Sequence, residues 1–187
     1  MKDIMKLTLK DKKVLIRVDF NVPLDDFFNI TDDSRIIAAL PTIKTIISKG
    51  GKAIIMSHLG RPQNGFEKKY SLKHLVNHLT SLLEKNVMFS KNCIGENTVK
   101  DVAKMNSGDV LLLENLRFYK EEKSGNEKFA KELAKLGDVY INDAFGTAHR
   151  NHASTSVIAQ FFPNNKYFGL LLKKEIHALN KVLTSAE

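Results

Sequence analysis

Residues suited to binding a small anion follow four apolar, strand-like runs of this sequence. They are Asp19 and Asn21 after the first run, His58 and Arg61 after the second, Arg117 after the fourth and Arg150 after the fifth. A further arginine, Arg35, stands at the start of an expected helix. The planar guanidinium group of arginine can donate two parallel hydrogen bonds to a phosphate or a carboxylate. Four arginines gathered at one sheet edge would form a compact anion site rather than a diffuse basic surface.

The runs that precede these residues are short and almost entirely apolar. Such runs are typical of parallel strands that are buried on both faces. The predicted strands are 14–18, 53–56, 87–89, 110–113, 138–141 and 167–170.

Longer segments with apolar residues at helical spacing separate the strands. We expect one helix that is capped by Asp33 or Ser34 and ends at Gly50 and Gly51, and another that begins at Ser71. Further helices are predicted over 97–105, 126–136 and 171–183, with Gly137 ending the second of these. Strand–helix–strand repetition predicts an α/β fold: a doubly wound, mainly parallel sheet of about six strands with helices on both faces, a Rossmann-like three-layer sandwich. Ligands of such sheets bind outside the carboxyl ends of the strands, where the anion-binding candidates stand.

The composition is that of an ordinary globular chain with a basic excess. The 187 residues are enough for one α/β domain, with 43% hydrophobic and 27% charged residues and a formal net charge of +8. The charge predicts an anionic partner without identifying it. Cys93 is the only cysteine, so disulfide frameworks and thiolate metal clusters are excluded and a packing role is expected. The apolar runs are too short to span a bilayer, which together with the single cysteine favours a cytoplasmic location and no membrane partner.

Other polar features are interpreted as structural. His74 and His78 have the i, i+4 spacing of metal ligands, but no third ligand is near in sequence, so we expect exposed helix histidines and no metal. His149 and His152 are expected to support the loop of Arg150, and the charged stretch 120–128 to be a solvated helix entry. The chain contains neither a phosphate loop of the Gly-x-x-x-x-Gly-Lys-[Ser/Thr] type nor a Gly-x-Gly-x-x-Gly fingerprint, so nucleotide binding by this chain alone is not expected.

Five of these segments resemble phosphoglycerate kinase, in the order and at spacings compatible with that family. They are RVDFNVPL at 17–24, ITDDSRI at 30–36, SHLGRP at 57–62, LENLRF at 113–118 and NDAFGTAHR at 142–150. The resemblance runs from about Leu9 to the last predicted helix, and five long motifs in register make it specific.

Phosphoglycerate kinases have two α/β domains that face a cleft. The N-terminal domain binds 3-phosphoglycerate or 1,3-bisphosphoglycerate, and the C-terminal domain binds ATP or ADP with Mg²⁺. The resemblance implies that 1–187 is the N-terminal, phosphoglycerate-binding domain, with 171–187 as the start of the interdomain helix. The nucleotide-binding domain is absent, so no cofactor is expected in this chain, and the fragment alone is expected to be inactive. The parent would be a monomeric, glycolytic enzyme that transfers a phosphoryl group reversibly between 1,3-bisphosphoglycerate and ADP.

The resemblance also implies a role for each candidate residue. Asp19 and Asn21 would hydrogen-bond the glycerate hydroxyl. The non-transferred phosphate would be surrounded by His58, Arg61, Arg117 and Arg150. Arg35 would be the catalytic residue, because it would reach the carboxyl end of the substrate and steady the transferring group.

Two other interpretations of the whole chain stay open. One is a nucleic-acid-binding module, which the net charge of +8 permits but which no recognised motif supports. The other is a non-catalytic anion-binding or scaffold protein with the same α/β fold. Binding of 3-phosphoglycerate at the arginine cluster would distinguish the kinase half from both.

Overall fold

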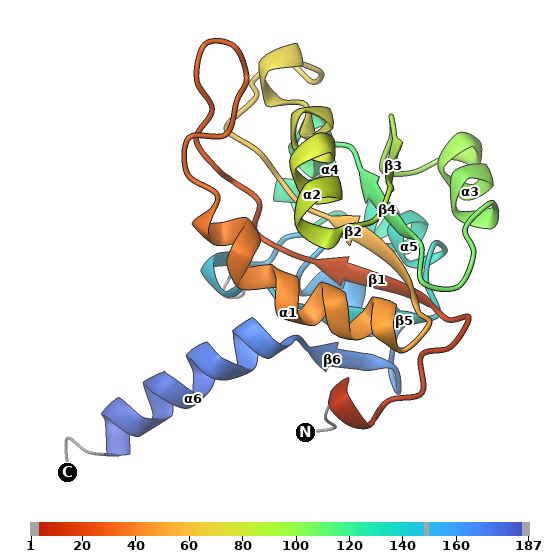
Figure 1. The fold of residues 1–187 in the computed structure, drawn as a ribbon, viewed down its shortest axis with the longest axis vertical. Helices are drawn as coiled ribbons and strands as arrows, with labels where there is room; N and C mark the ends of the chain where they lie inside the picture. The colour runs from red at the N-terminus through yellow and green to blue at the C-terminus, as the bar shows by residue number, and fades with distance from the viewer. Residues whose placement is uncertain (1–3, 148–149, 185–187) are drawn as a thin grey trace.

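Six parallel strands form one sheet in the computed structural model, which describes residues 4–147 and 150–184 without the side chains of Thr147 and of 182–184. The strand order is β3-β4-β2-β1-β5-β6, so β1 lies in the interior of the sheet (Figure 1). The strands are β1 (Lys13–Arg17), β2 (Lys52–Met56), β3 (Val87–Ser90), β4 (Val110–Leu113), β5 (Val139–Asn142) and β6 (Lys166–Phe168). The prediction of a mainly parallel sheet of about six strands is confirmed.

The strand boundaries agree with the predicted ones to within a residue or two. Every residue of β4 and β5 is buried, as expected for strands with helices on both faces. The largest difference is β6, which ends at Phe168 rather than at residue 170. Gly169 donates its N–H to the carbonyl of Asn142, and Leu170 already begins the last helix, so helix formation displaces the end of the predicted strand.

Helices cover both faces of the sheet. They are α1 (Ser34–Ser48), α2 (Val76–Leu83), α3 (Glu96–Ala103), α4 (Lys120–Lys123), α5 (Glu127–Ala134) and α6 (Leu170–Thr184). The connections include short 3-10 helices: η1 (Ile4–Lys6), η2 (Lys68–Tyr70), η3 (Leu72–Leu75), η4 (Leu116–Phe118), η5 (Phe145–Thr147) and η6 (Val157–Phe161). Ile43 of α1 and Leu79 of α2 belong to the hydrophobic core on one face, whereas Val102 of α3 and Phe129 of α5 belong to the core on the other. The predicted three-layer sandwich is confirmed.

The first helix starts differently from the prediction. Asp33 occupies the N-cap position, as predicted, but its side chain makes no capping hydrogen bond; instead Asp32 Oδ1 accepts the Ser34 N–H at 2.9 Å. The Asp33 carboxylate is occupied elsewhere, with Oδ2 2.8 Å from His78 Nε2 on α2. The Asp33 side chain therefore contacts a histidine of α2 instead of capping α1.

Gly137 has a packing role rather than the predicted helix-ending role. Helix α5 already ends at Ala134, and Gly137 does not have a left-handed backbone. A Cβ at Gly137 would lie 2.9 Å from Leu15 Cβ, so the absence of a side chain lets the turn before β5 pass close against β1.

The histidines of the second helical segment have protein partners. His74 stacks on Phe28 with ring centroids 4.4 Å apart, and its Nε2 lies 2.7 Å from the carbonyl oxygen of Lys68. Like His78, it is half-buried, so the prediction of exposed histidines is wrong. Within residues 4–147 and 150–184, no group of three or more His, Cys, Asp or Glu residues could hold a metal ion. Cys93 is buried and its Sγ donates to the Glu114 carbonyl, as expected of a packing residue.

The last helix begins inside the fold and leaves it. Leu172, near its start, is buried, whereas Leu179 is half exposed. Figure 1 shows α6 extending away from the sheet and its covering helices. In the part of the chain that the structure describes, none of the helices combines the length and apolarity needed to cross a membrane.

Candidate functional site

A cavity of about 770 Å³ opens at the carboxyl ends of four adjacent strands, β4, β2, β1 and β5. Strands β4 and β5 are consecutive in the chain but lie on opposite sides of β1. The β1–β5 boundary is therefore the topological switch point, where α/β sheets bind ligands. The cavity is lined by Asp19, Asn21, Arg35, His58, Arg61, Lys123, Arg117, Phe145, Gly146, Arg150 and Glu175. All seven of the residues predicted from the sequence lie in its wall.

Arginine and lysine are distributed very differently around this cavity. The chain has five arginines and 24 lysines. Four of the arginines line the cavity, and the fifth, Arg17, lies directly behind it in contact with His58. Among the lysines that the structure describes, only Lys123 lines it. A lysine-rich surface surrounds a site built from arginine, the side chain suited to bidentate contact with phosphate and carboxylate.

The loop after β1 supplies the acidic wall of the cavity. Asp19 Oδ1 accepts the backbone N–H of Asn21 at 3.2 Å, and Asp19 Oδ2 accepts Arg35 Nη1 at 2.8 Å. The Arg35 side chain is 52% exposed, so it can leave this ion pair without breaking the packing of α1. The carboxylate therefore holds Arg35 at the mouth of the cavity.

The loop after β2 forms the opposite wall around Gly60. The Gly60 N–H donates to Asn21 Oδ1 at 2.7 Å, and the Gly60 carbonyl accepts Arg117 Nη1 at the same distance. Gly60 has a left-handed backbone with φ of 61°, and a Cβ there would lie 2.3 Å from the ring of Tyr70. Only glycine fits this turn, which joins the loops after β1, β2 and β4 at one point.

Asn115 fixes the loop after β4 against the loop after β2. This fully buried side chain donates through Nδ2 to the carbonyls of Leu59 (2.7 Å) and Tyr70 (2.9 Å). Its Oδ1 accepts the N–H groups of Leu59 (3.2 Å) and Arg117 (3.0 Å). All four hydrogen-bonding positions of the amide are used, so Arg117 is held in place from its backbone as well as from its guanidinium group.

Mutual repulsion and burial shape the titration of the site. Burial, then the neighbouring charges of Arg150, Arg17 and Arg61, lowers the pKa of Arg117. Burial and nearby arginines, Arg17 first among them, lower the pKa of His58 to about 2, and burial and Arg117 lower that of His152 to about 4. Both histidines are therefore neutral near pH 7, and the positive charge of the cluster comes from its arginines.

Sequence reasoning missed several residues of the site. Arg17 begins the motif RVDFNVPL at 17–24, but no function was predicted for its side chain. A charged residue at the end of an apolar strand was the signal that could have identified it. Glu122 was wrongly assigned to a solvated stretch: it is 1% exposed and hydrogen-bonds Ser154 behind the cavity. The other missed wall residues are Lys123, Phe145, Gly146 and Glu175.

The loop after β5 brings Arg150 to the cavity. The His152 N–H donates to the Arg150 carbonyl at 2.8 Å, in line with the supporting role expected of His152. His149, for which the same role was predicted, lies outside the described residues.

The depressed histidine pKa values make the fold acid-sensitive. His58 and His152 are neutral when folded and bind a proton on unfolding, so stability is fully present above about pH 6.5 and falls as the pH is lowered towards their folded pKa values of about 2 and about 4. Each histidine is expected to contribute a slope of up to about 1.4 kcal/mol per pH unit between about pH 6 and pH 5. Urea unfolding at a series of pH values measures it.

Variants isolate the contribution of His58 to this slope. His58→Gln should reduce the slope by up to about 1.4 kcal/mol per pH unit, because a glutamine takes up no proton on unfolding. His177→Gln is the matched control, because it makes the same chemical change at an exposed position of α6, outside the buried cluster. An unchanged slope in His58→Gln would contradict the assignment of a neutral, buried His58.

A family model described as phosphoglycerate kinase matches residues 3–187 of this chain. The chain belongs to the phosphoglycerate kinase family. The phosphoglycerate kinase of Dictyoglomus turgidum is 52% identical over 185 residues, which is 99% of this chain and 46% of that protein. That of Chlorobium phaeobacteroides is 48% identical over 186 residues, which is 100% of this chain and 47% of that protein. The chain thus spans about half the length of the curated relatives it matches.

Solved phosphoglycerate kinases share the fold as well as the sequence. The enzyme of Pyrococcus horikoshii superposes with a TM-score of 0.86 at 34% identity, over 97% of this chain and 45% of that one. The enzyme of Coxiella burnetii superposes with a TM-score of 0.83 at 38% identity, over 94% of this chain and 43% of that one.

Proposed function

We propose that this chain is the phosphoglycerate-binding, N-terminal half of a cytoplasmic, glycolytic phosphoglycerate kinase. In that role residues 1–187 are one substrate domain, with 171–187 as the start of the helix that joins it to a nucleotide-binding domain. The observation that carries the proposal is the convergence of Asp19, Asn21, Arg35, His58, Arg61, Arg117 and Arg150 on one cavity. The membership of the family gives the reaction to which that cavity is suited.

The charge of the cavity suits a small phosphorylated acid. Its wall carries five cationic side chains and two carboxylates, so a ligand with one phosphate and one carboxylate would relieve the repulsion among the arginines. The non-transferred phosphate lies among His58, Arg61, Arg117 and Arg150 in this proposal. Each arginine would contribute a charge-assisted hydrogen bond of roughly 1.5–3 kcal/mol.

The acidic wall suits the rest of the ligand. Asp19 accepts the hydrogen bond of the glycerate hydroxyl, and Asn21, whose Oδ1 is held by Gly60, donates to it through Nδ2. Arg35 then leaves its ion pair with Asp19 and binds the carboxyl end of the ligand, where charge develops during phosphoryl transfer. Arg35 is the catalytic residue in this assignment, and no general base is needed because a carboxylate is already a nucleophile.

The nucleotide belongs to the other half of the enzyme. The sequence contains neither a phosphate loop nor a Gly-x-Gly-x-x-Gly fingerprint, so in this proposal ATP or ADP with Mg²⁺ is held by the other half. On its own, the chain binds the acid and transfers no phosphoryl group, and the domain that holds the nucleotide is its partner in a monomeric parent.

Calorimetric titration with 3-phosphoglycerate tests this proposal. The wild-type chain should bind the acid and not ATP, and Arg61→Ala should weaken binding about 10-fold or more because it removes a charge-assisted hydrogen bond. Lys44→Ala is the matched control: it removes one positive charge from an exposed position of α1, outside the cavity. Equal affinities for wild type and Arg61→Ala, or no binding of the acid by the wild type, would contradict the proposed site.

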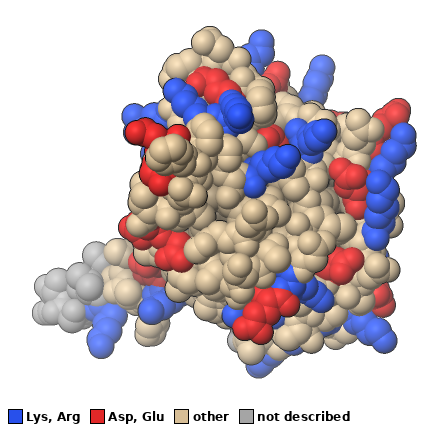
Figure 2. Space-filling model, turned by 45° about the horizontal axis from the view of Figure 1, so that its top comes forward, with Lys and Arg blue, Asp and Glu red and all other residues tan. Residues whose placement is uncertain are grey.

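The same titration with an oligonucleotide tests the alternative of a nucleic-acid-binding module. Figure 2 shows lysines and arginines mixed with acidic residues over the face it presents, rather than joined into one basic surface. We therefore expect no oligonucleotide binding at physiological salt. Tight binding with a steep dependence on salt concentration would favour the alternative.

A further inference from the structure

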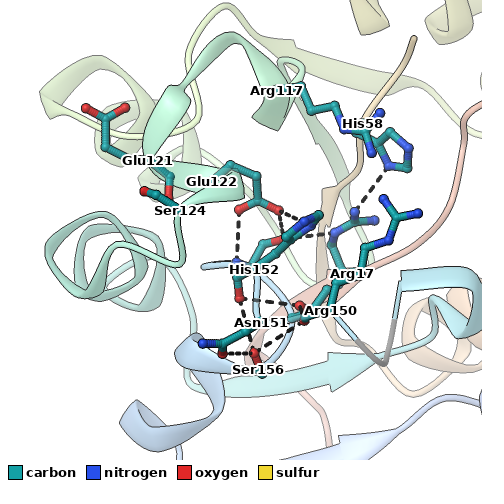
Figure 3. Close-up of polar contacts among 12 residues, drawn as sticks. Arg17, His58, Arg117, Glu121, Glu122, Ser124, Arg150, Asn151, His152 and Ser156 are labelled. Carbon is teal, nitrogen blue, oxygen red and sulfur yellow. Dashed lines mark hydrogen bonds and ion pairs between the residues drawn. The ribbon is translucent and has the colours of Figure 1, made fainter. Parts of the chain in front are cut away.

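A chain of buried polar side chains runs behind the cavity from Glu122 of α4 to His58 (Figure 3). Glu122 Oε1 accepts the Ser154 hydroxyl at 2.6 Å, and its Oε2 accepts the Ser154 backbone N–H at 3.0 Å. Ser154 is fully buried and Glu122 is 1% exposed. A carboxylate taken out of water at this depth needs strong partners, and these two hydrogen bonds supply them.

Arg17 continues the chain towards the cavity. Its Nε donates to Ser154 Oγ at 2.9 Å and its Nη1 donates to the Val18 carbonyl. Arg17 is 1% exposed, so its charge is buried, and it lies close enough to Arg117 to lower the pKa of that residue. The carboxylate of Glu122, one hydroxyl away, is the charge that balances it.

The contact between Arg17 and His58 fixes the position of a proton. Arg17 Nη2 lies 3.2 Å from His58 Nδ1. A guanidinium group has only donors, so His58 Nδ1 must be the acceptor and the single ring proton must lie on Nε2. His58 lines the cavity, so this Nε2–H group is the donor that it can offer to an anion.

A competing arrangement lies close by. Asp19 Oδ1 is 3.8 Å from the same His58 Nδ1, just beyond hydrogen-bonding distance. If Arg17 released Nδ1, a small rotation of the ring would let Nδ1 carry the proton and donate to Asp19. His58 would then present a bare nitrogen, an acceptor, where a phosphate oxygen needs a donor. The charged and titratable groups that face His58 are Arg17, Asp19, Arg117, Arg150 and His152.

We propose that Glu122 and Ser154 are positioning residues that act through Arg17 to keep the His58 proton on Nε2, ready to donate to the phosphate of the ligand. The proposal deepens the proposed function, on which the identity of the ligand rests. Neither Glu122 nor Ser154 lines the cavity, so their effect on binding is indirect, and Arg17 is the residue that links them to His58.

Two measurements on the full chain test the relay. Long-range ¹H–¹⁵N spectra of ¹⁵N-histidine-labelled protein identify which ring nitrogen of His58 carries the proton, and calorimetry gives the affinity for 3-phosphoglycerate. The variants are Ser154→Ala, which removes the hydroxyl between Glu122 and Arg17, and Glu122→Gln, which removes the balancing charge. Glu121→Gln is the matched control, because it makes the same change on the same helix and Figure 3 shows Glu121 pointing away from the relay.

We expect the wild type and Glu121→Gln to have the Nε2–H form of His58. Both Ser154→Ala and Glu122→Gln should shift His58 towards the Nδ1–H form and weaken 3-phosphoglycerate binding about 10-fold, the lower end of the effect seen when a residue that orients a metal-binding side chain is removed. A merely structural role would lower the melting temperature but leave the tautomer unchanged.

The outcomes separate this inference from the proposed function. A wild type with the proton on Nδ1 overturns the relay even if a variant does not fold, and so do variants that keep both the wild-type tautomer and affinity. A wild type that fails to bind 3-phosphoglycerate overturns the proposed function, while the tautomers of wild type and variants still decide the relay.

Discussion

Asn115→Leu is expected to lower the free energy of unfolding by about 3–5 kcal/mol, a large share of the stability of a typical domain. Leucine has a similar size but no hydrogen-bonding group, so it leaves the carbonyls of Leu59 and Tyr70 and the N–H groups of Leu59 and Arg117 without their partner. Each unsatisfied buried group costs roughly 1–3 kcal/mol, and local rearrangement and entry of water recover part of the sum. Urea unfolding followed by circular dichroism measures the loss.

A matched substitution shows whether the effect comes from the buried hydrogen bonds. Asn77→Leu makes the same chemical change at an exposed position of α2 and should alter the free energy of unfolding by no more than about 0.5 kcal/mol. If Asn115→Leu were as mild as this control, Asn115 would not be the residue that joins the loops after β2 and β4.

Arg117→Ala is expected to weaken 3-phosphoglycerate binding by about 10- to 150-fold, corresponding to roughly 1.5–3 kcal/mol. The substitution removes one cationic wall of the proposed phosphate site and also releases the Gly60 carbonyl, to which Arg117 Nη1 donates at 2.7 Å. The free energy of unfolding of the unliganded chain should change far less than the free energy of 3-phosphoglycerate binding. The lost hydrogen bond opposes folding, whereas relief of the repulsion from Arg150, Arg17 and Arg61, which lowers the pKa of Arg117, favours it.

Arg117→Lys separates charge from geometry in this prediction. Lysine keeps the positive charge but lacks the planar fork, so its affinity should lie between those of the wild type and Arg117→Ala. Calorimetry with the three proteins, accompanied by thermal unfolding of each, gives both quantities. A change in affinity of less than about two-fold for Arg117→Ala would exclude Arg117 as a phosphate ligand.

The burial of Glu122 shows why the support of the site could not be derived from local sequence. Helix α4 is a four-residue, highly charged segment, which by itself is typical of a solvated helix entry. Glu122 is buried because Ser154, 32 residues further along the chain, folds back over it and donates two hydrogen bonds. The residues between them include an intervening helix and strand, so no spacing rule connects the pair.

The sequence of this protein by itself determined the sheet, its direction and seven of the eleven residues that line the cavity. Apolar runs such as Val110–Leu113 indicate strands that are buried on both faces, and such strands are typical of parallel sheets with helices on either side. Once the strands are parallel, their carboxyl ends meet at one edge. His58 after β2 and Arg117 after β4 were therefore expected at the same edge of the sheet, and the pairing of β2 with β4 makes them neighbours.

Only the tertiary structure decided how those side chains are held and which state they adopt. The pairing of Asp33 with His78, the close passage of Gly137 against Leu15 and the link from Glu122 through Ser154 and Arg17 to His58 all join residues far apart in the chain. Hydrogen bonds of this kind depend on positions matched to within a fraction of an ångström. Hydrophobic periodicity fixes which face of an element is buried, but it carries no information at that precision.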